Sequence, residues 1–142
     1  MEQALYKAAI LTFEELGFMF PTLELSEMEI DEENGAAISV GFNGEMQGQL
    51  VLQIERSMLP VIAANMLGED APLEEHMQRD ALGEIANVIC GNALPEIAGK
   101  KALFRLDAPQ FVVAQDITQE PAAIARIELE EGRAEVLLYL NQ

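Results

Sequence analysis

Apolar and polar residues alternate with a helical period between Arg79 and Leu94. At 100° per residue, the polar positions of this stretch lie within about 60° of one another, and the apolar positions lie on the opposite side. The polar face carries Asp80, Glu84, Asn87 and Gly91, and the apolar face carries Leu82, Ile85, Ile89 and Ala93. The pattern predicts a helix with one buried face and with Glu84 and Asn87 exposed on the other.

This stretch belongs to a longer predicted helix that starts near Leu73. We expect Pro95 to kink or end it, because the proline ring clashes with the carbonyl group four residues earlier. Helical spacing of apolar residues also predicts a first helix over residues 2–16, with Gly17 as its C-terminal cap. A short connecting helix is predicted over residues 57–68.

Period-two alternation predicts six strands, three before the connecting helix and three after the long helix. They cover residues 22–30, 36–42, 45–55, 102–115, 122–130 and 133–141. Asn43-Gly44 and Glu131-Gly132 are typical of tight turns between antiparallel strands. We therefore predict one α+β domain over residues 1–142, in which a helix and three antiparallel strands occur twice. These units cover about 1–55 and 73–142 and surround the long central helix.

The last predicted strand, residues 133–141, has apolar residues on both faces. Such a strand is either central in a sheet or an edge that needs cover. We predict a homodimer, in which a second copy of the chain supplies cover for the sheet.

Composition narrows the classes of partner. Of 142 residues, half are apolar, and 25 acidic against 8 basic residues leave a net charge of −17. This charge repels nucleic acid and anionic membranes, so we expect neither as a partner. No apolar run is long enough to span a bilayer and the first residues do not resemble a secretion signal, so we expect a cytoplasmic protein. The single cysteine, Cys90, is predicted to be a small buried thiol rather than a nucleophile.

Conventional catalytic and metal sites are poorly represented. One His and one Cys do not build a nucleophile–base pair unaided, and no glycine-rich phosphate loop is present. His76 and Asp80 are four residues apart on one helix face, but two ligands do not make a metal site. A solvated acidic helix start explains them better, and we predict no cofactor or metal of the chain's own.

The spacing Asp80-x3-Glu84-x2-Asn87-x21-Pro109 resembles the signature of the CheC/CheX chemotaxis phosphatases. The words around it are also similar, since residues 83–92 read like the active helix of CheX and Met66-Leu-Gly68 like the helix end before it. The resemblance extends over nearly the whole chain. It implies the CheC-like fold, with the pseudo-duplication that the element order indicates. Because the first helix carries no Glu-x-x-Asn, one site per chain is expected.

The resemblance also implies a mechanism that needs few residues. The substrate would be the aspartyl phosphate of a phosphorylated CheY-like response regulator, which brings its own magnesium ion and lysine. Asn87 would hold a water in line with the phosphorus, and Glu84 would pair with the regulator's lysine. Asp80 and Pro109 would support the helix and the following strand, and Gly91 would permit close approach.

Two other interpretations of the polar helix face remain. The chain could be a non-catalytic interaction module of the same fold, which binds a response regulator or a flagellar switch protein. The face could also be an ordinary solvated surface, because exposed helices commonly carry Glu and Asn.

Overall fold

The computed structural model describes residues 1–22, 30, 34–68 and 74–141. Within these residues, six strands form one antiparallel sheet in the order β3-β1-β2-β6-β5, with β4 also paired to β1. The predicted α+β fold with an antiparallel sheet is confirmed. The elements are α1 (Glu2–Gly17), β1 (Gly35–Gly44), β2 (Gly48–Glu55), α2 (Met58–Leu67), α3 (Glu75–Ala98), β3 (Phe104–Leu106), β4 (Gln110–Val112), the short 3-10 helix η1 (Ala114–Asp116), β5 (Ala123–Leu129) and β6 (Gly132–Leu140).

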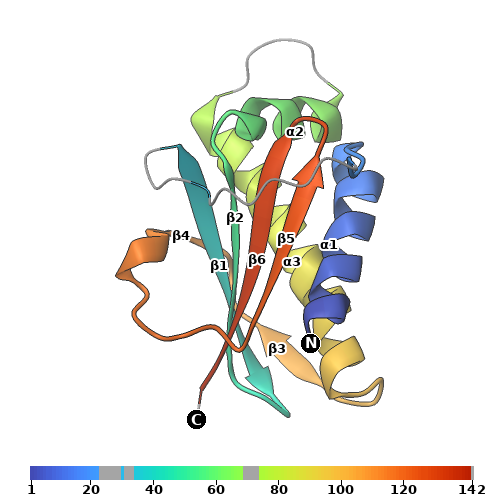
Figure 1. Cartoon of the computed structure of the whole chain (residues 1–142), viewed down its shortest axis with the longest axis vertical. Coiled ribbons are helices and arrows are strands. Elements are labelled where there is room, and N and C mark those ends of the chain that lie inside the picture. Colours follow the sequence, from blue (N-terminus) through green and yellow to red (C-terminus); the bar gives the residue numbers. More distant parts are fainter. Residues whose placement is uncertain (23–29, 31–33, 69–73, 142) are drawn as a thin grey trace.

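The helices cover one face of the sheet and enclose the main core (Figure 1). α1 packs over β5 and β6, α3 packs over β1 and β2, and the two long helices contact each other. The alternation in the strands explains this layer, because every second side chain of a strand points to the same face. Its largest fully buried side chains include Phe13, Phe42, Ile54, Leu82 and Ile85.

The opposite face of the sheet has a smaller apolar cluster. Ala37, Val51 and Tyr139 are buried there, and Val112 of β4 and Ile117 of the segment after it pack against them. Burial, followed by the charge of Glu135, raises the pKa of Tyr139 above its ordinary value. The chain therefore has two layers with a partial cover on the second face.

The last strand is central. β6 pairs with β2 on one side and β5 on the other, which accounts for its apolar residues on both faces. The alternative that it lies at the sheet edge is excluded. The predicted homodimer is a separate matter and stays a prediction.

The single strand predicted over residues 102–115 is wrong. The structure has β3 and β4 there, followed by η1, and both strands pair with β1. Leu106 is opposite Phe42, whereas Gln110 is opposite Ser39, so the edge carries one residue more than β1 between these pairs. This is a β-bulge, and Pro109 lies within it because proline has no N–H to give to a sheet ladder.

Two details at the helix ends differ from the predictions. The alternative that α3 ends at Pro95 is wrong, because the helix continues to Ala98, and a kink at Pro95 stays a prediction. The lost hydrogen bond falls near the helix end, where Gly91 is exposed and its carbonyl group can be hydrated. In α1, Gly17 is the last helical residue, and Phe18 takes the left-handed conformation, with φ 52°.

Some predictions lie wholly or partly outside the described residues. The strand predicted over 22–30 contains residues 23–29, and the start of the long helix near Leu73 is also outside. Just before residues 23–29, the Thr22 N–H donates to the Glu128 carbonyl (2.9 Å), and Pro21 forms a β-bridge with Leu129 in β5.

The pseudo-duplication of a helix and three strands stays a prediction. In the described part of the chain, none of the helices has the length and apolar character to cross a membrane.

Candidate functional site

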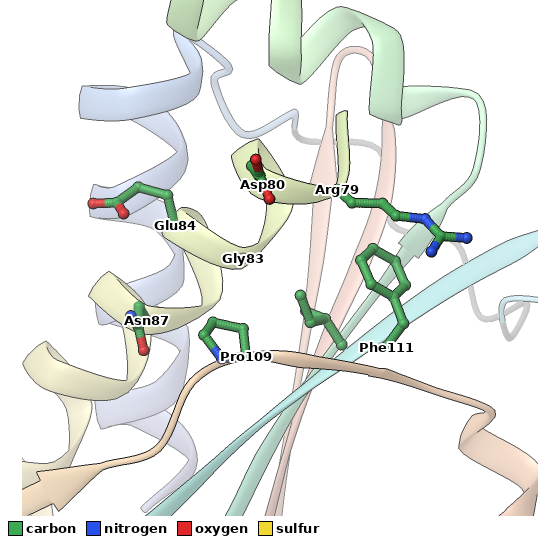
Figure 2. Close-up of a pocket in the computed structure, with 8 residues that line it drawn as sticks. Arg79, Asp80, Gly83, Glu84, Asn87, Pro109 and Phe111 are labelled. Atoms are coloured by element: carbon green, nitrogen blue, oxygen red, sulfur yellow. The ribbon is translucent and has the colours of Figure 1, made fainter. Parts of the chain in front are cut away.

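A pocket of about 360 Å³ lies between the first half of α3 and the bulged edge of the sheet. α3 supplies five of its lining residues, and the others come from β1, the bulge and β4 (Figure 2). The lining residues are Ile38, Arg79, Asp80, Gly83, Glu84, Asn87, Pro109 and Phe111. Four residues of the predicted site, Asp80, Glu84, Asn87 and Pro109, are thus brought together around one hollow.

Glu84 and Asn87 project from the same side of α3, one turn apart (Figure 2). The prediction that both are exposed is right for Glu84 and wrong for Asn87, which is half-buried. The Asn87 Oδ1 atom is fully covered, and no group among the described residues donates a hydrogen bond to it. A covered carbonyl oxygen without a donor costs on the order of 1–3 kcal/mol, so a turn of the Asn87 amide that exposes this oxygen to a donor would be favourable.

Pro109 is held against α3 at Gly83. A Cβ built on Gly83 would be 3.4 Å from the Pro109 ring and 3.5 Å from Ile38 Cδ1, so the space beside the helix has room for one methyl group and no more. Gly83 is buried, and its lack of a side chain lets the bulge pack directly on the helix backbone. This contact fixes the distance between the edge of the sheet and the face that carries Glu84 and Asn87.

Arg79 and Phe111 form the other end of the pocket. The Arg79 guanidinium carbon lies 4.9 Å from the centre of the Phe111 ring, which is cation–π geometry. An Arg79 Nη2–H donates to Glu75 Oε1 at 2.9 Å, one turn earlier on α3. Figure 2 shows the Arg79 side chain extending over Phe111, away from Glu84 and Asn87.

The remaining predicted site residues differ in position. Asp80 is exposed at the pocket, while Gly91 is not among the residues that line it. A Cβ on Gly91 would meet only Leu106 Cδ1, at 4.0 Å, so the chain itself makes no close approach there. Approach by a partner at Gly91 stays a prediction.

Groups that could carry other chemistry are few. Cys90 lies on the buried face of α3, and burial raises the pKa of its thiol to about 12, so it is held as the unreactive thiol. His76 is exposed, with Nδ1 3.2 Å from Glu74 Oε2. Within residues 1–22, 30, 34–68 and 74–141, no group of three or more His, Cys, Asp and Glu side chains could hold a metal ion.

Three pocket residues besides Ile38 were missed by the analysis of the sequence: Arg79, Gly83 and Phe111. One signal was available, because Phe111 follows Pro109 by two residues and therefore shares its side of an extended chain. The pairing of Arg79 with Phe111 had no signal in the sequence, since it depends on how α3 sits against the edge of the sheet.

A family model described as the chemotaxis phosphatase CheX matches residues 36–130, about two-thirds of the chain. This range includes α3, the bulge and every residue that lines the pocket. No curated protein has a sequence that matches this one.

Solved structures show the same fold. A chemotaxis protein CheX from Desulfovibrio desulfuricans is 17% identical, with a TM-score of 0.75 over 98% of this chain and 97% of that one. CheX from Borrelia burgdorferi, in a complex with CheY, BeF3 and Mg2+, is 15% identical, with a TM-score of 0.67 over 99% and 97%. FliY from Thermotoga maritima is 18% identical, with a TM-score of 0.57 over 95% and 83%. At these identities the likeness concerns the fold.

Proposed function

Because the chain belongs to the family of the chemotaxis phosphatase CheX, we propose that it accelerates hydrolysis of the aspartyl phosphate of a CheY-like response regulator. The Borrelia burgdorferi CheX complex contains CheY, which supports a regulator of this type as the partner. The observation that carries the proposal is the pair Glu84 and Asn87, which line the same pocket one helical turn apart on α3.

In the proposed reaction, the Asn87 side chain enters the regulator's phosphorylation pocket. The Asn87 side-chain amide hydrogen-bonds a water and holds the water oxygen in line with the phosphorus. The water oxygen bonds to phosphorus, the bond from phosphorus to the aspartyl oxygen breaks, and a proton passes from the water to phosphate or solvent. The products are a carboxylate and inorganic phosphate. Phosphoryl transfer leaves little covalent work to the protein, so placing the water supplies much of the rate.

Glu84 has a different task in this proposal. Its exposed carboxylate is one helical turn from Asn87 and can pair with a lysine of the regulator, which fixes how the two proteins dock. The magnesium ion that neutralises charge on the phosphoryl group belongs to the regulator. The residues of this chain bind, orient and position the water, and no cofactor of its own enters the reaction.

The decisive experiment follows the loss of phosphoryl label from each CheY-like regulator of the same organism, in the presence of Mg2+. Increasing concentrations of this protein should accelerate the loss from at least one regulator until the rate saturates. Acceleration of none would overturn the phosphatase proposal. The interaction-module alternative, in which the same face binds a regulator without hydrolysis, would then take its place.

A further inference from the structure

Arg79 stands out because of its charge. The whole chain has 8 basic and 25 acidic residues, and Arg79 is the only cation among the described residues that line the pocket. The same pocket carries the carboxylates of Asp80 and Glu84. A basic group in this position offers local attraction to an anionic partner where the overall charge of the chain is repulsive.

Phe111 holds this cation at the rim. Phe111 is paired with Ile38 across β1 and β4, so the two side chains lie on the helix-facing side of the sheet. The ring is 37% exposed, and the Arg79 guanidinium lies over it at 4.9 Å. Glu75 accepts a hydrogen bond from the guanidinium at 2.9 Å, and that bond occupies one of the five N–H donors. Phe111 and Glu75 together orient the charge, and donors remain for a partner.

The surface around Phe111 extends beyond the pocket. A second hollow, lined by Phe111, Val112, Val113, Asp116 and Ile117, borders the first one at Phe111. Val113 is 47% exposed in it. The surface therefore combines a cation, an exposed aromatic ring and an adjoining apolar area. Arginine and aromatic residues are enriched in this way in protein–protein interfaces.

We infer that Arg79, seated on Phe111, is a docking residue that binds an acidic side chain on the regulator outside the reacting centre; this rests on the proposed function. Arg79 precedes Asn87 by eight residues, which is about 12 Å along a helix, and its side chain extends the opposite way. It is thus too far from Asn87 to contact the phosphoryl group. A pocket that holds Mg2+ beside an aspartyl phosphate is built from carboxylates, and an acidic rim suits a guanidinium.

Loss of a docking residue lowers the affinity for the regulator but not the hydrolysis rate at saturating protein, whereas loss of a catalytic residue lowers that rate. Arg79→Gln should weaken binding of the regulator roughly fivefold and reduce the dependence of binding on salt, because a rim charge acts mainly on association. The hydrolysis rate at saturating protein should be unchanged. Arg79→Lys keeps the charge and loses the planar stacking on Phe111, so its affinity should fall between the native protein and Arg79→Gln.

Arg105 provides a matched control. It is an exposed arginine in β3, and its neighbour Leu106 faces α3, so Arg105 points to the opposite face of the sheet. Arg105→Gln makes the same change in net charge and should leave affinity unchanged. Equal weakening by Arg79→Gln and Arg105→Gln would show an effect of net charge alone and overturn the inference.

The test is a binding titration of fluorescently labelled regulator with Mg2+ at two salt concentrations, alongside the loss of phosphoryl label. An Arg79→Gln affinity equal to that of the native protein would overturn the docking role. If the native protein binds a regulator through Arg79 but does not accelerate hydrolysis, the docking role stands and the phosphatase proposal fails. If the native protein binds none of the regulators, the docking inference fails.

Discussion

The two long helices lie side by side on the same face of the sheet but differ in what borders them (Figure 1). α1 packs over β5, a continuous strand paired along its length with β6. α3 lies beside an edge that is broken by the bulge between β3 and β4, and Pro109 of that bulge packs on Gly83. A pocket that carries Glu84 and Asn87 lies beside α3. A hollow of about 310 Å³ also lies between α1 and β5, so what distinguishes the hollow beside α3 is the bulged edge, which places Pro109 next to Glu84 and Asn87.

The two helices also differ in the polar side chains that they carry. α1 carries Glu14 and Glu15 near its end but contains no Asn, and position 18 holds an exposed Phe in the left-handed conformation. α3 carries the acid and the amide in its first half, where the bulge closes one side of the hollow. A variant that carries the Glu-x-x-Asn at the end of α1 instead of on α3 therefore tests whether the surroundings of α3 matter.

The largest effect is expected from moving the amide. Asn87→Ala combined with Phe18→Asn places an Asn three residues after Glu15, at an exposed position whose left-handed conformation Asn tolerates. We expect this double variant to be no more active than Asn87→Ala alone, on the order of 100-fold below the native protein, because position 18 lies just beyond the helix and α1 lacks the bulged edge. Loss of phosphoryl label measures it.

Phe18→Asn alone is the control for that experiment. It should keep native activity and native thermal stability, since Phe18 is 61% exposed. Recovered hydrolysis in the double variant would mean that a Glu-x-x-Asn on any helix of this fold is sufficient.

A smaller effect is expected from the contact between the helix and the bulge. Gly83→Ala should fit, because its Cβ would lie in ordinary contact with Pro109 at 3.4 Å, and it should stabilise α3 by up to about 1 kcal/mol. Gly83→Val should push the bulge away, lower stability by about 1–3 kcal/mol and reduce activity further than Ala does. Thermal unfolding and label loss, measured on both variants, separate these results.

Gly83→Ala therefore serves as the control for Gly83→Val, because both add a side chain to the helix but only Val should displace the bulge. If Gly83→Val is folded and as active as Gly83→Ala, then the packing of Pro109 on α3 does not position the site. The role of the bulge would then be limited to the sheet.

The polar stripe of α3 could be predicted because it depends only on helical spacing. Asp80, Glu84 and Asn87 repeat at three- and four-residue intervals, and the buried face opposite them has the same period. Such a pattern depends only on residues that are close together in the sequence, so it can be recognised without knowledge of the fold. The tight turn predicted at Asn43-Gly44 is wrong, because β1 runs through Gly44 and pairs there with β3, and the chain turns at residues 45–47.

The rest of the site could not be predicted because it depends on contacts between distant segments. Residues 102–115 alternate like one strand, and the extra residue that makes the bulge is visible only against its partner β1. The covered oxygen of Asn87 and the position of Arg79 over Phe111 likewise arise from packing. The helix does not end at Pro95 because a proline in the last turns of a helix removes a hydrogen bond only near the helix end, where it costs less than in the middle.

The role of Asn87 is tested most sharply by single-turnover loss of label from the cognate phosphorylated regulator, at saturating protein and with Mg2+. Asn92, exposed on α3, supplies a matched control as Asn92→Ala. We predict that Asn87→Ala binds the regulator but stays on the order of 100-fold slower at any concentration, whereas Asn92→Ala is native. Raising the concentration of Glu84→Ala should restore part of its rate, because Glu84 acts in docking. Full activity of Asn87→Ala at saturation would contradict the positioning of water by this amide.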